Sequence, residues 1–348
     1  MHHESLCTDP DLSPMPLSVV IPVHDDRAGL ARCLAALQAS AMADVDFVVV
    51  DDASSDDPAA VATPMGARIL RLADNVGPAA ARNHGARHAR GDILLFVDAD
   101  VVVAPGALER VVQVLRSRRD VAAVFGSYDA DPAADGIVSR YKNLLHHFVH
   151  QEGNVEASTF WAGCGAIRRA AFEAVGGFDE KRFRHPSIED IDLGYRLRRA
   201  GYRILLDTGL QATHLKRWTF RSLLHTDVML RALPWSRLSL ESRVLVDDLN
   251  LKRDQRLSAA LIALAVVCLA LAPLHPALSA VSAAAALEVG LLNRRLYAFF
   301  ARRGGLCFAA ACVLLHWLYY LYSGLTYVAV WTVFRLKALA TLGRGGRQ

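Results

Sequence analysis

The chain of 348 residues has few cysteines, and the six present, at positions 7, 33, 164, 268, 307 and 312, show no paired metal spacing. Several lie in long apolar segments, so the sequence supports neither a zinc site nor a disulfide framework. The formal net charge is only +4. The basic residues gather between positions 217 and 256 and beyond, as expected for a surface that lies on anionic lipid rather than a nucleic-acid cleft.

The first 16 residues contain acids and prolines but lack an apolar core. They do not have the pattern of a secretory signal and predict a disordered leader. Without an export signal, the domain that follows is expected to stay in the cytoplasm.

One apolar run carries two carboxylates at its end. Residues 91–97 read Gly-Asp-Ile-Leu-Leu-Phe-Val, which predicts a buried parallel strand, and Asp98 and Asp100 follow. If the strand continues, both carboxylates point to the same side, because side chains alternate along a strand. Such a pair suits Mg²⁺ or Mn²⁺ with a phosphate-bearing ligand. A solvated turn after the strand fits the same residues.

Strands and helices alternate through the first hundred residues. Strands are expected at 17–23, 46–50 and 68–71, and helices at 28–39 and from Pro78 to about residue 89. This alternation predicts an α/β fold, with a mostly parallel sheet covered by helices on both faces. Ligands bind such sheets beyond the carboxyl ends of the strands, so the acids that follow Val50 and Val97 should face one crevice.

These motifs, in this order, resemble the inverting family 2 glycosyltransferases, whose nucleotide-sugar domain has the A-type glycosyltransferase fold. The matching blocks are residues 19–24, 49–56, 98–100, 168–169, 176–180 and 189–197, followed by Gly201-Tyr202. Because the blocks occur in this order, the probability that they agree by chance is very small. The resemblance implies a catalytic domain over residues 17–218 that binds a nucleotide-sugar donor.

The resemblance also implies which residues hold the donor. Donor contacts are expected from Pro22, Asp51, Asp52, Arg82, Asp98 and Arg217. By analogy Asp98 and Asp100 would bind a divalent cation, Mg²⁺ or Mn²⁺, at the diphosphate. His214 is either a further metal ligand or diphosphate contact, or a histidine held in the structure by hydrogen bonds. Arg82 either reaches the nucleotide or is a solvated or surface-paired charge on a helix.

A second acidic motif lies at 189–192. Ser187 is expected to cap a helix that ends near Ala200, before Gly201. Asp190 heads an apolar, inward-facing stripe of that helix, which suits a general base that takes the proton of an acceptor hydroxyl. The alternative is a first-turn acid that interacts with the helix dipole. Glu189 is expected to steer or partner Asp190, and Asp192 to form an exposed ion pair with Arg196.

Acceptor contacts are assigned to Gly163, Cys164 and Trp218. Close approach of substrate to the backbone at Gly163 is one interpretation, and a structural bend is the other. Processive polysaccharide synthases carry Gln-x-x-Arg-Trp where this chain reads His214-Leu-Lys-Arg-Trp218, so the glutamine is absent. This departure weakens the case for processive polymer synthesis.

The last third of the chain is apolar. Membrane spans are expected at about 257–274, 277–292 and 306–334, with a basic tail at 335–348. Three crossings would place the tail outside the cytoplasm, against the positive-inside rule, so the third segment is either re-entrant or a broken hairpin. Residues 219–256 would form an amphipathic connection that lies at the membrane interface or packs on the catalytic domain.

The sequence therefore predicts a multi-pass membrane enzyme of the cell envelope, with its catalytic domain in the cytoplasm. The expected reaction is metal-dependent, inverting transfer of a sugar from a nucleotide diphosphate, UDP-linked, to a membrane lipid or lipid-linked acceptor. The bilayer is an expected partner and nucleic acid is not. Two alternatives stay open: a processive polysaccharide synthase, and a non-catalytic scaffold that binds nucleotide sugars.

Overall fold

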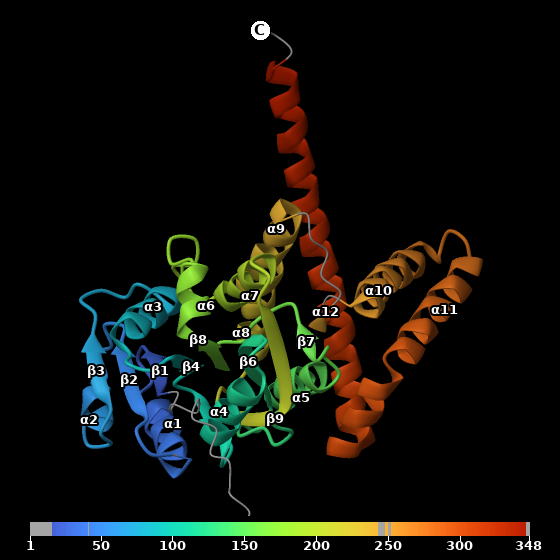
Figure 1. Ribbon diagram of the computed structural model, residues 1–348. Helices are drawn as coiled ribbons and strands as arrows, with labels where there is room; N and C mark the ends of the chain where they lie inside the picture. The colour runs from blue at the N-terminus through green and yellow to red at the C-terminus, as the bar shows by residue number, and fades with distance from the viewer. Residues whose placement is uncertain (1–15, 41, 243–247, 250–251, 346–348) are drawn as a thin grey trace, which may run out of the picture.

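Figure 1 shows the computed structural model, which describes residues 16–40, 42–242, 248–249 and 252–345. The strands are β1 (Leu17–Val23), β2 (Asp46–Asp51), β3 (Arg68–Arg71), β4 (Ile93–Val97), β5 (Val101–Val103), β6 (Val121–Tyr128), β7 (Glu156–Ala157), β8 (Cys164–Arg168) and β9 (Arg203–His214). The helices of the sheet domain are α1 (Arg27–Ala39), α2 (Ala59–Ala62), α3 (Pro78–His88), α4 (Ala107–Ser117), α5 (Ile137–Gln151), α6 (Arg169–Ala174) and α7 (Glu189–Arg199). The leader predicted for residues 1–16 lies outside the described residues, except for Pro16.

The helices that follow are α8 (Phe220–His225), the π-helical η1 (Thr226–Ala232), α9 (Leu233–Ser242), α10 (Arg253–Leu271), α11 (Ala277–Leu292) and α12 (Arg294–Gly345). In Figure 1 α10, α11 and α12 lie to one side of the sheet domain, and α12 extends beyond it.

The strands form a single sheet in the order β3-β2-β1-β4-β8-β6-β9-β5, with β7 paired to β9. The first four strands in this order run parallel, as the sequence predicts. By contrast, β8 runs antiparallel to β4 and β6, and β5 and β7 run antiparallel to β9. The α/β fold is confirmed, but the sheet is more mixed than predicted. The reason is that β8 begins beside the last residue of β4 and therefore runs in the opposite direction. At this point the amide of Asp98 donates to the carbonyl of Gly163.

Both faces of the sheet are covered by helices. On one face Ile21 and Leu95 pack in a core with apolar residues of α1 and α4. On the other face Val20 and Phe96 pack in a core with residues of α3 and α7. The alternation of side chains along a strand puts neighbouring residues into opposite cores. Because both faces are occupied by apolar side chains, polar groups gather at the strand ends.

The segment α8–η1–α9 packs on the sheet domain. Trp235 and Leu238 belong to the same core as α3 and α7, and Leu223 packs with residues of α5. Of the two alternatives for this segment, the structure thus shows contact with the sheet domain. Phe220 and Met229 nevertheless remain 48% and 51% exposed, so an apolar outer side is also present.

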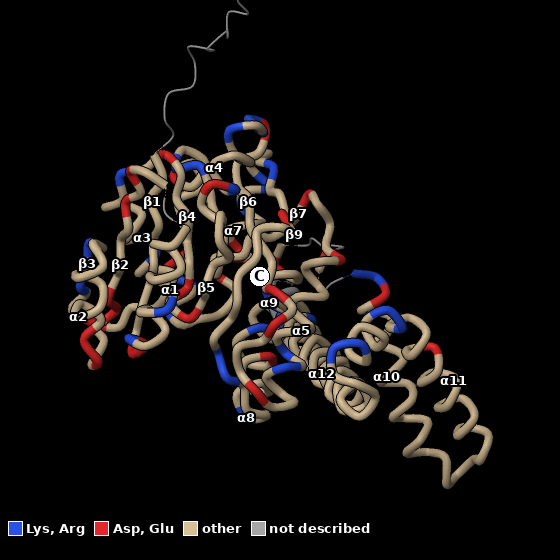
Figure 2. The backbone as a smooth tube through the Cα atoms, turned by 90° about the horizontal axis from the view of Figure 1, so that it is seen from below, with Lys and Arg blue, Asp and Glu red and all other residues tan. Residues whose placement is uncertain are grey.

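Two described helices, α10 and α12, are long and apolar enough to cross a membrane, and α11 is a shorter apolar helix. Figure 2 shows α10 and α11 extending away from the sheet, with almost no charged residues towards their joined tip. Residues 294–303, expected to connect two spans, are helical and form the first part of α12. The helix is interrupted at Gly305, whose φ is +78°. The expected re-entrant or broken-hairpin form of 306–334 is wrong, because this stretch is one continuous helix.

A buried ion pair joins three of these helices. The ammonium of Lys142, on α5, lies 2.5 Å from Oδ1 of Asp227, on η1, and both side chains are 3% exposed. The hydroxyl of Tyr322, on α12, donates to Oδ2 of Asp227 at 2.6 Å. Burial is the main cause that lowers the pKa of Lys142, and Asp227 opposes this effect. The carboxylate of Asp227 therefore holds η1 to both the sheet domain and the long helix.

We expect Asp227→Asn to destabilise the protein strongly, because it leaves the buried Lys142 ammonium without its counter-charge. Removing one partner of a buried ion pair typically costs about 3–5 kcal/mol. Thermal or denaturant unfolding of the full chain in detergent measures the effect. The matched control is Glu241→Gln, which removes the exposed pair with Arg182 and should cost at most about 1 kcal/mol. Equal effects of the two changes would contradict the role given to Asp227.

Candidate active site

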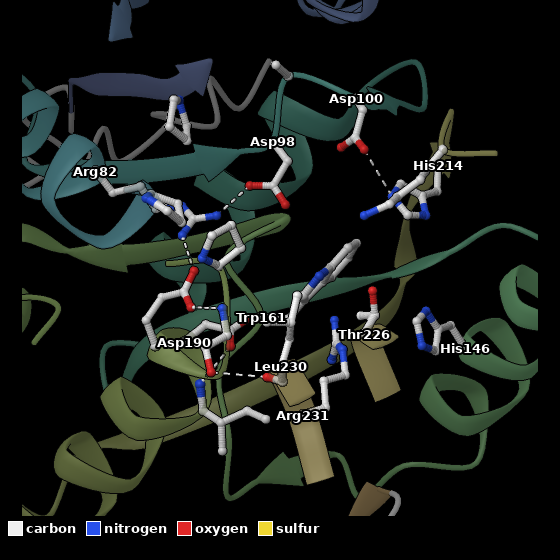
Figure 3. Close-up of a pocket in the computed structure, with 18 of the residues that line it drawn as sticks. Arg82, Asp98, Asp100, His146, Trp161, Asp190, His214, Thr226, Leu230 and Arg231 are labelled. Atoms are coloured by element: carbon white, nitrogen blue, oxygen red, sulfur yellow. Dashed lines mark hydrogen bonds and ion pairs between the residues drawn. The ribbon is translucent and has the colours of Figure 1, made fainter. Parts of the chain in front are cut away.

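A cavity of about 460 Å³ lies at the carboxyl ends of β1, β2 and β4. Pro22, Asp52, Asp98 and Asp100 line it from the sheet, and Asp190 lines it from the first turn of α7. Residues of η1 close it on the opposite side (Figure 3). The crevice predicted from the strand order is therefore present, and acids from distant parts of the chain meet in it.

Asp98 and Asp100 lie in a turn rather than in a continued strand. The amide of Val101 donates to the carbonyl of Asp98 at 3.0 Å, which closes the turn. Both carboxylates still line the cavity. Of the two forms considered for the pair, a continued strand and a turn after the strand, the structure has the turn, and both carboxylates still reach one cavity.

Asp100 is held by His214. Oδ2 of Asp100 lies 3.3 Å from Nε2 of His214, at the end of β9. Burial alone would raise the pKa of Asp100, but the hydrogen bond and charge of His214, together with Lys216, keep this pKa below its ordinary value. Asp100 is therefore a carboxylate at neutral pH.

The donor atoms of Asp98, Asp100 and His214 are of the kinds that Mg²⁺ and Mn²⁺ accept, namely carboxylate oxygen and imidazole nitrogen. Within the described residues no three His, Cys, Asp or Glu side chains already stand close enough to hold a metal ion. The donor set fits a divalent cation that takes its other ligands from phosphate and water. The protein supplies one side of such a site.

Arg82 bridges two acids that are distant in sequence. Its guanidinium donates to Asp98 at 2.6 Å and to Glu189 at 2.8 Å, and its side chain is only 6% exposed. Burial works against the charged form, yet these two carboxylates raise the pKa of Arg82. Arg82 is thus neither solvated nor surface-paired. It connects the end of β4 to the start of α7 and contributes a nitrogen to the cavity wall.

Asp190 lies beside this bridge. Its Oδ2 accepts from the amide of Ala162 at 3.3 Å, and its Oδ1 accepts from the amide of Ile191. Burial, followed by the negative charge of Glu189, raises the pKa of Asp190 to about 6. Asp190 is therefore a carboxylate at neutral pH whose basicity is well above that of an exposed aspartate.

Two details of the helix that carries Asp190 differ from the sequence prediction. Ser187 does not cap α7: its hydroxyl donates to the carbonyl of Leu230, and the N-cap position is Ile188. Asp192 forms the expected ion pair with Arg196 at 2.7 Å but is buried rather than exposed. Glu189 is fixed by Arg82 and by the amide of Ser187. The carboxylate of Glu189 is therefore not free, and its role as a partner of Asp190 stays a prediction.

At the nucleoside end, only one of the two consecutive acids faces the cavity. Asp52 lines it and accepts from the amides of Val76 and Gly77 at 2.8 and 2.9 Å. Asp51 is buried outside the lining, where it accepts from the amide of Ser54 and lies 3.5 Å from Arg71. A donor contact of Asp51 is therefore a wrong prediction, because its carboxylate shapes the turn after β2 instead.

Three further predicted contacts lie away from the cavity. Arg217 is exposed and outside the lining, whereas its neighbour Lys216 lines the cavity, with its ammonium 4.5 Å from the centre of the Trp218 ring. Cys164 is 0% exposed and pairs with Val97 inside the sheet. A side chain at Gly163 would come within 2.6 Å of the Trp161 ring. Arg217, Cys164 and Gly163 are therefore removed from the candidate contacts, and Trp218 stays.

The structure adds residues that the sequence analysis did not single out. Trp161 packs edge-on against Tyr128 with ring centres 4.6 Å apart, and His146 and His150 lie on the same wall of the cavity. These two histidines are four residues apart on α5, a spacing that puts both on one helix face and could have been noticed. Arg231 of η1 also lines the cavity, and no local pattern marks it because η1 reaches the cavity only through tertiary packing.

Residues 18–176 match the family described as Glycosyl transferase family 2. The pre-mycofactocin glycosyltransferase of Mycobacterium tuberculosis (strain ATCC 25618 / H37Rv) is 33% identical over 208 residues, which cover 54% of this chain and 40% of that protein. The cellulose synthase 1 catalytic subunit (UDP-forming) of Komagataeibacter xylinus is 28% identical over 228 residues, which cover 60% and 30%. The chain thus spans less than half the length of both curated relatives.

Among solved structures, a mannosyltransferase, PcManGT, from Pyrobaculum calidifontis in complex with GDP-Man and Mn²⁺ is similar over 90% of this chain and 86% of that one. The TM-score is 0.53 and the sequence identity 16%. This likeness supports the A-type glycosyltransferase fold of the chain. It extends through the C-terminal helices as well as the sheet domain.

We expect the Asp190 carboxyl to titrate near pH 6, and Glu189→Gln to lower this pKa because the change removes a neighbouring negative charge. Infrared difference spectra recorded between about pH 4 and pH 8 measure the midpoint of the carboxyl band that Asp190→Asn abolishes. Glu173→Gln, an exposed acid on α6, serves as control and should leave the midpoint unchanged. The same midpoint in wild type and Glu189→Gln would refute the assigned coupling.

Proposed function

We propose that this chain, whose residues 18–176 are a family 2 glycosyltransferase domain, transfers a sugar from a UDP-linked donor to a lipid or lipid-linked acceptor with inversion. The observation that carries the proposal is that Asp52, Asp98, Asp100 and Asp190 line one cavity. Inverting transfer needs a group that binds the leaving diphosphate and a group that accepts a proton. Asp98 and Asp100 would meet the first need through a divalent cation, and the more basic Asp190 would meet the second.

The donor is assigned to the strand-end side of the cavity. Pro22 and Asp52 line the part nearest β1 and β2, where a nucleoside would lie. A divalent cation on Asp98 and Asp100, with His214, would offset the charge that develops on the departing diphosphate. Lys216 stands beside this group and supplies a fixed positive charge from the protein itself.

Asp190 is assigned as the general base. Its carboxylate would take the proton of the acceptor hydroxyl while that oxygen attacks the anomeric carbon and the bond to the diphosphate breaks. A pKa of about 6 leaves Asp190 ionised at neutral pH yet basic enough to help. The amides of Ala162 and Ile191 hold it in position. Trp161 and Trp218 line the cavity and offer ring faces against which a sugar or acceptor can pack.

The C-terminal helices motivate the choice of a membrane acceptor. Their length and composition suit a bilayer, and the segment α8–η1–α9 connects them to the cavity. We further propose that the sheet domain lies on the cytoplasmic side. A polymer-forming synthase is the second candidate, because a cellulose synthase subunit is among the similar proteins. Against it stands His214, which occupies the place of the glutamine in Gln-x-x-Arg-Trp.

Two variants test the roles in catalysis. Asp190→Asn should lower the transfer rate by about 10²–10⁴-fold, the typical contribution of a general base, while the protein still binds nucleotide. Asp100→Ala should weaken both nucleotide binding and transfer. In wild type, kcat/KM should fall as pH drops through about 6, because Asp190 becomes protonated. Labelled UDP-sugars and a lipid extract, with the full chain in detergent, give the rates, and the chain length of the product separates single transfer from polymerisation.

The control for both variants is Glu173→Gln, on the exposed side of α6, which should transfer at the wild-type rate. Full transfer by Asp190→Asn would remove the assigned base. Nucleotide binding without turnover in wild type, across a broad range of acceptors, would instead favour a non-catalytic scaffold.

A separate measurement tests the membrane assignment. We expect the full chain to remain in the membrane pellet after an alkaline carbonate wash, because α10 and α12 are long apolar helices. Protease should cleave the sheet domain in inside-out vesicles and spare it in sealed right-side-out vesicles. Release of the chain by carbonate would exclude spanning helices, and cleavage only in right-side-out vesicles would reverse the proposed orientation.

A further inference from the structure

Arg231 is a charged residue of the cavity to which the roles above give no task. It lies on η1 and lines the cavity opposite the strand-end carboxylates. Among the residues that the structure describes, no hydrogen bond or ion pair is found for its side chain, although Asp190 is near enough for the charge of Arg231 to lower the carboxyl pKa. In Figure 3 the guanidinium is directed into the space between Asp190 and His146.

The side chains around Arg231 are neutral imidazoles and acids that have other hydrogen-bond partners. Burial, with a contribution from Arg231, lowers the pKa of His150 to about 4 and that of His146 well below its usual range, so both imidazoles are neutral at pH 7. The acids at the strand ends have other partners: Arg82 pairs with Asp98, and His214 bonds to Asp100. Asp190 is the nearby acid, but its carboxylate oxygens accept from the amides of Ala162 and Ile191, and it forms no ion pair with Arg231 within the described structure. This part of the cavity is therefore suited to an anion.

The site is built into the fold rather than carried on a loose surface side chain. Asp227, four residues before Arg231, is buried and fixed by Lys142 and Tyr322. Two polar atoms of residues that line the cavity, Oγ1 of Thr159 and Nδ1 of His150, are buried without a hydrogen-bond partner within the described structure. Thr159 is only 1% exposed. Buried polar atoms usually have partners, so such atoms in a cavity wall point to a ligand.

The geometry points to a phosphate group of the acceptor as that ligand: we propose that Arg231 binds the phosphate of a phosphate-bearing lipid. This inference rests on the proposed function, which puts the donor diphosphate at Asp98, Asp100 and Lys216, and so leaves Arg231 to the second substrate. Arginine binds phosphate through two parallel hydrogen bonds. Leu230 beside it lines the cavity too; the preceding residue, Met229, is an exposed apolar side chain, and Asp227 ties η1 to α12.

The test is a binding titration of the full chain in non-ionic detergent, read from tryptophan fluorescence, since Trp161, Trp218 and Trp235 line the cavity. The probes are dodecyl phosphate, dodecanol and inorganic phosphate. Wild type should bind dodecyl phosphate about tenfold or more tightly than either other probe, a factor within the range of one charge-assisted interaction. Arg231→Gln should remove this preference, and Arg231→Lys should keep part of it, because the charge stays and the paired hydrogen bonds are lost.

Arg237→Gln is the matched control, because Arg237 is exposed on α9 and outside the cavity lining; it should bind dodecyl phosphate like wild type. Equal binding of dodecyl phosphate and dodecanol by wild type, or an unchanged preference in Arg231→Gln, would overturn the inference. Tighter binding of inorganic phosphate than of dodecyl phosphate would show a free-anion site and also overturn it. UDP titrated in the same samples separates the two proposals: wild type that does not bind UDP contradicts the proposed function, whereas UDP binding with no effect of Arg231→Gln contradicts this inference alone.

Discussion

The cavity depends on one buried cation. Arg82 joins Asp98 at the end of β4 to Glu189 at the start of α7, and these two positions are brought together only by the folded sheet. The carboxylates of Asp98, Glu189 and Asp190 lie within one cavity and would repel one another. The guanidinium of Arg82, which has two carboxylate partners, offsets much of that repulsion. Two of its five N–H groups make these bonds, and its buried Nε has no hydrogen-bond partner within the described structure. Arg82 thus fixes the positions of Asp98 and Glu189 relative to each other.

The acids of the cavity are of two kinds, which differ in the pKa of the carboxyl group. Asp100, next to His214, has its pKa held below the ordinary value, whereas Asp190 has its pKa raised to about 6 by burial and by Glu189. Since Glu189 is fixed by Arg82, its negative charge stays close to Asp190 and does not turn to solvent. Two carboxylates with such different basicity can perform different tasks at one pH, one as a charge that binds and the other as a proton acceptor.

Sequence patterns predicted what depends on local chemistry and on strand order. The parallel strands β1 to β4, the helix from Pro78 and the strand-end position of Asp52 and Asp98 follow from hydrophobic runs and their polar ends. Reversed strands, buried ion pairs and side-chain direction depend on distant residues and were missed. Asp51 and Asp52 show the limit: they are adjacent and chemically alike, and only the turn after β2 decides that Asp52 faces the cavity. Cys164 and Arg217 failed in the same way, since neither burial in a sheet centre nor the direction of a loop residue has a local signal.

The last third of the chain both provides the long apolar helices and packs against the sheet domain. The apolar content of residues 257–334 suggests lipid as their neighbour, yet Tyr322 of α12 donates to Asp227, and Trp235 of the preceding segment packs into the sheet-domain core. The same short element, η1, thus touches the long helix on one side and presents Arg231 and Leu230 to the cavity on the other. The strand-end carboxylates, by contrast, lie at the ends of β2 and β4 and have no such contact with α12 among the described residues. The part of the cavity assigned to the acceptor is therefore the part tied to the helices assigned to the membrane, and the part assigned to the donor is not.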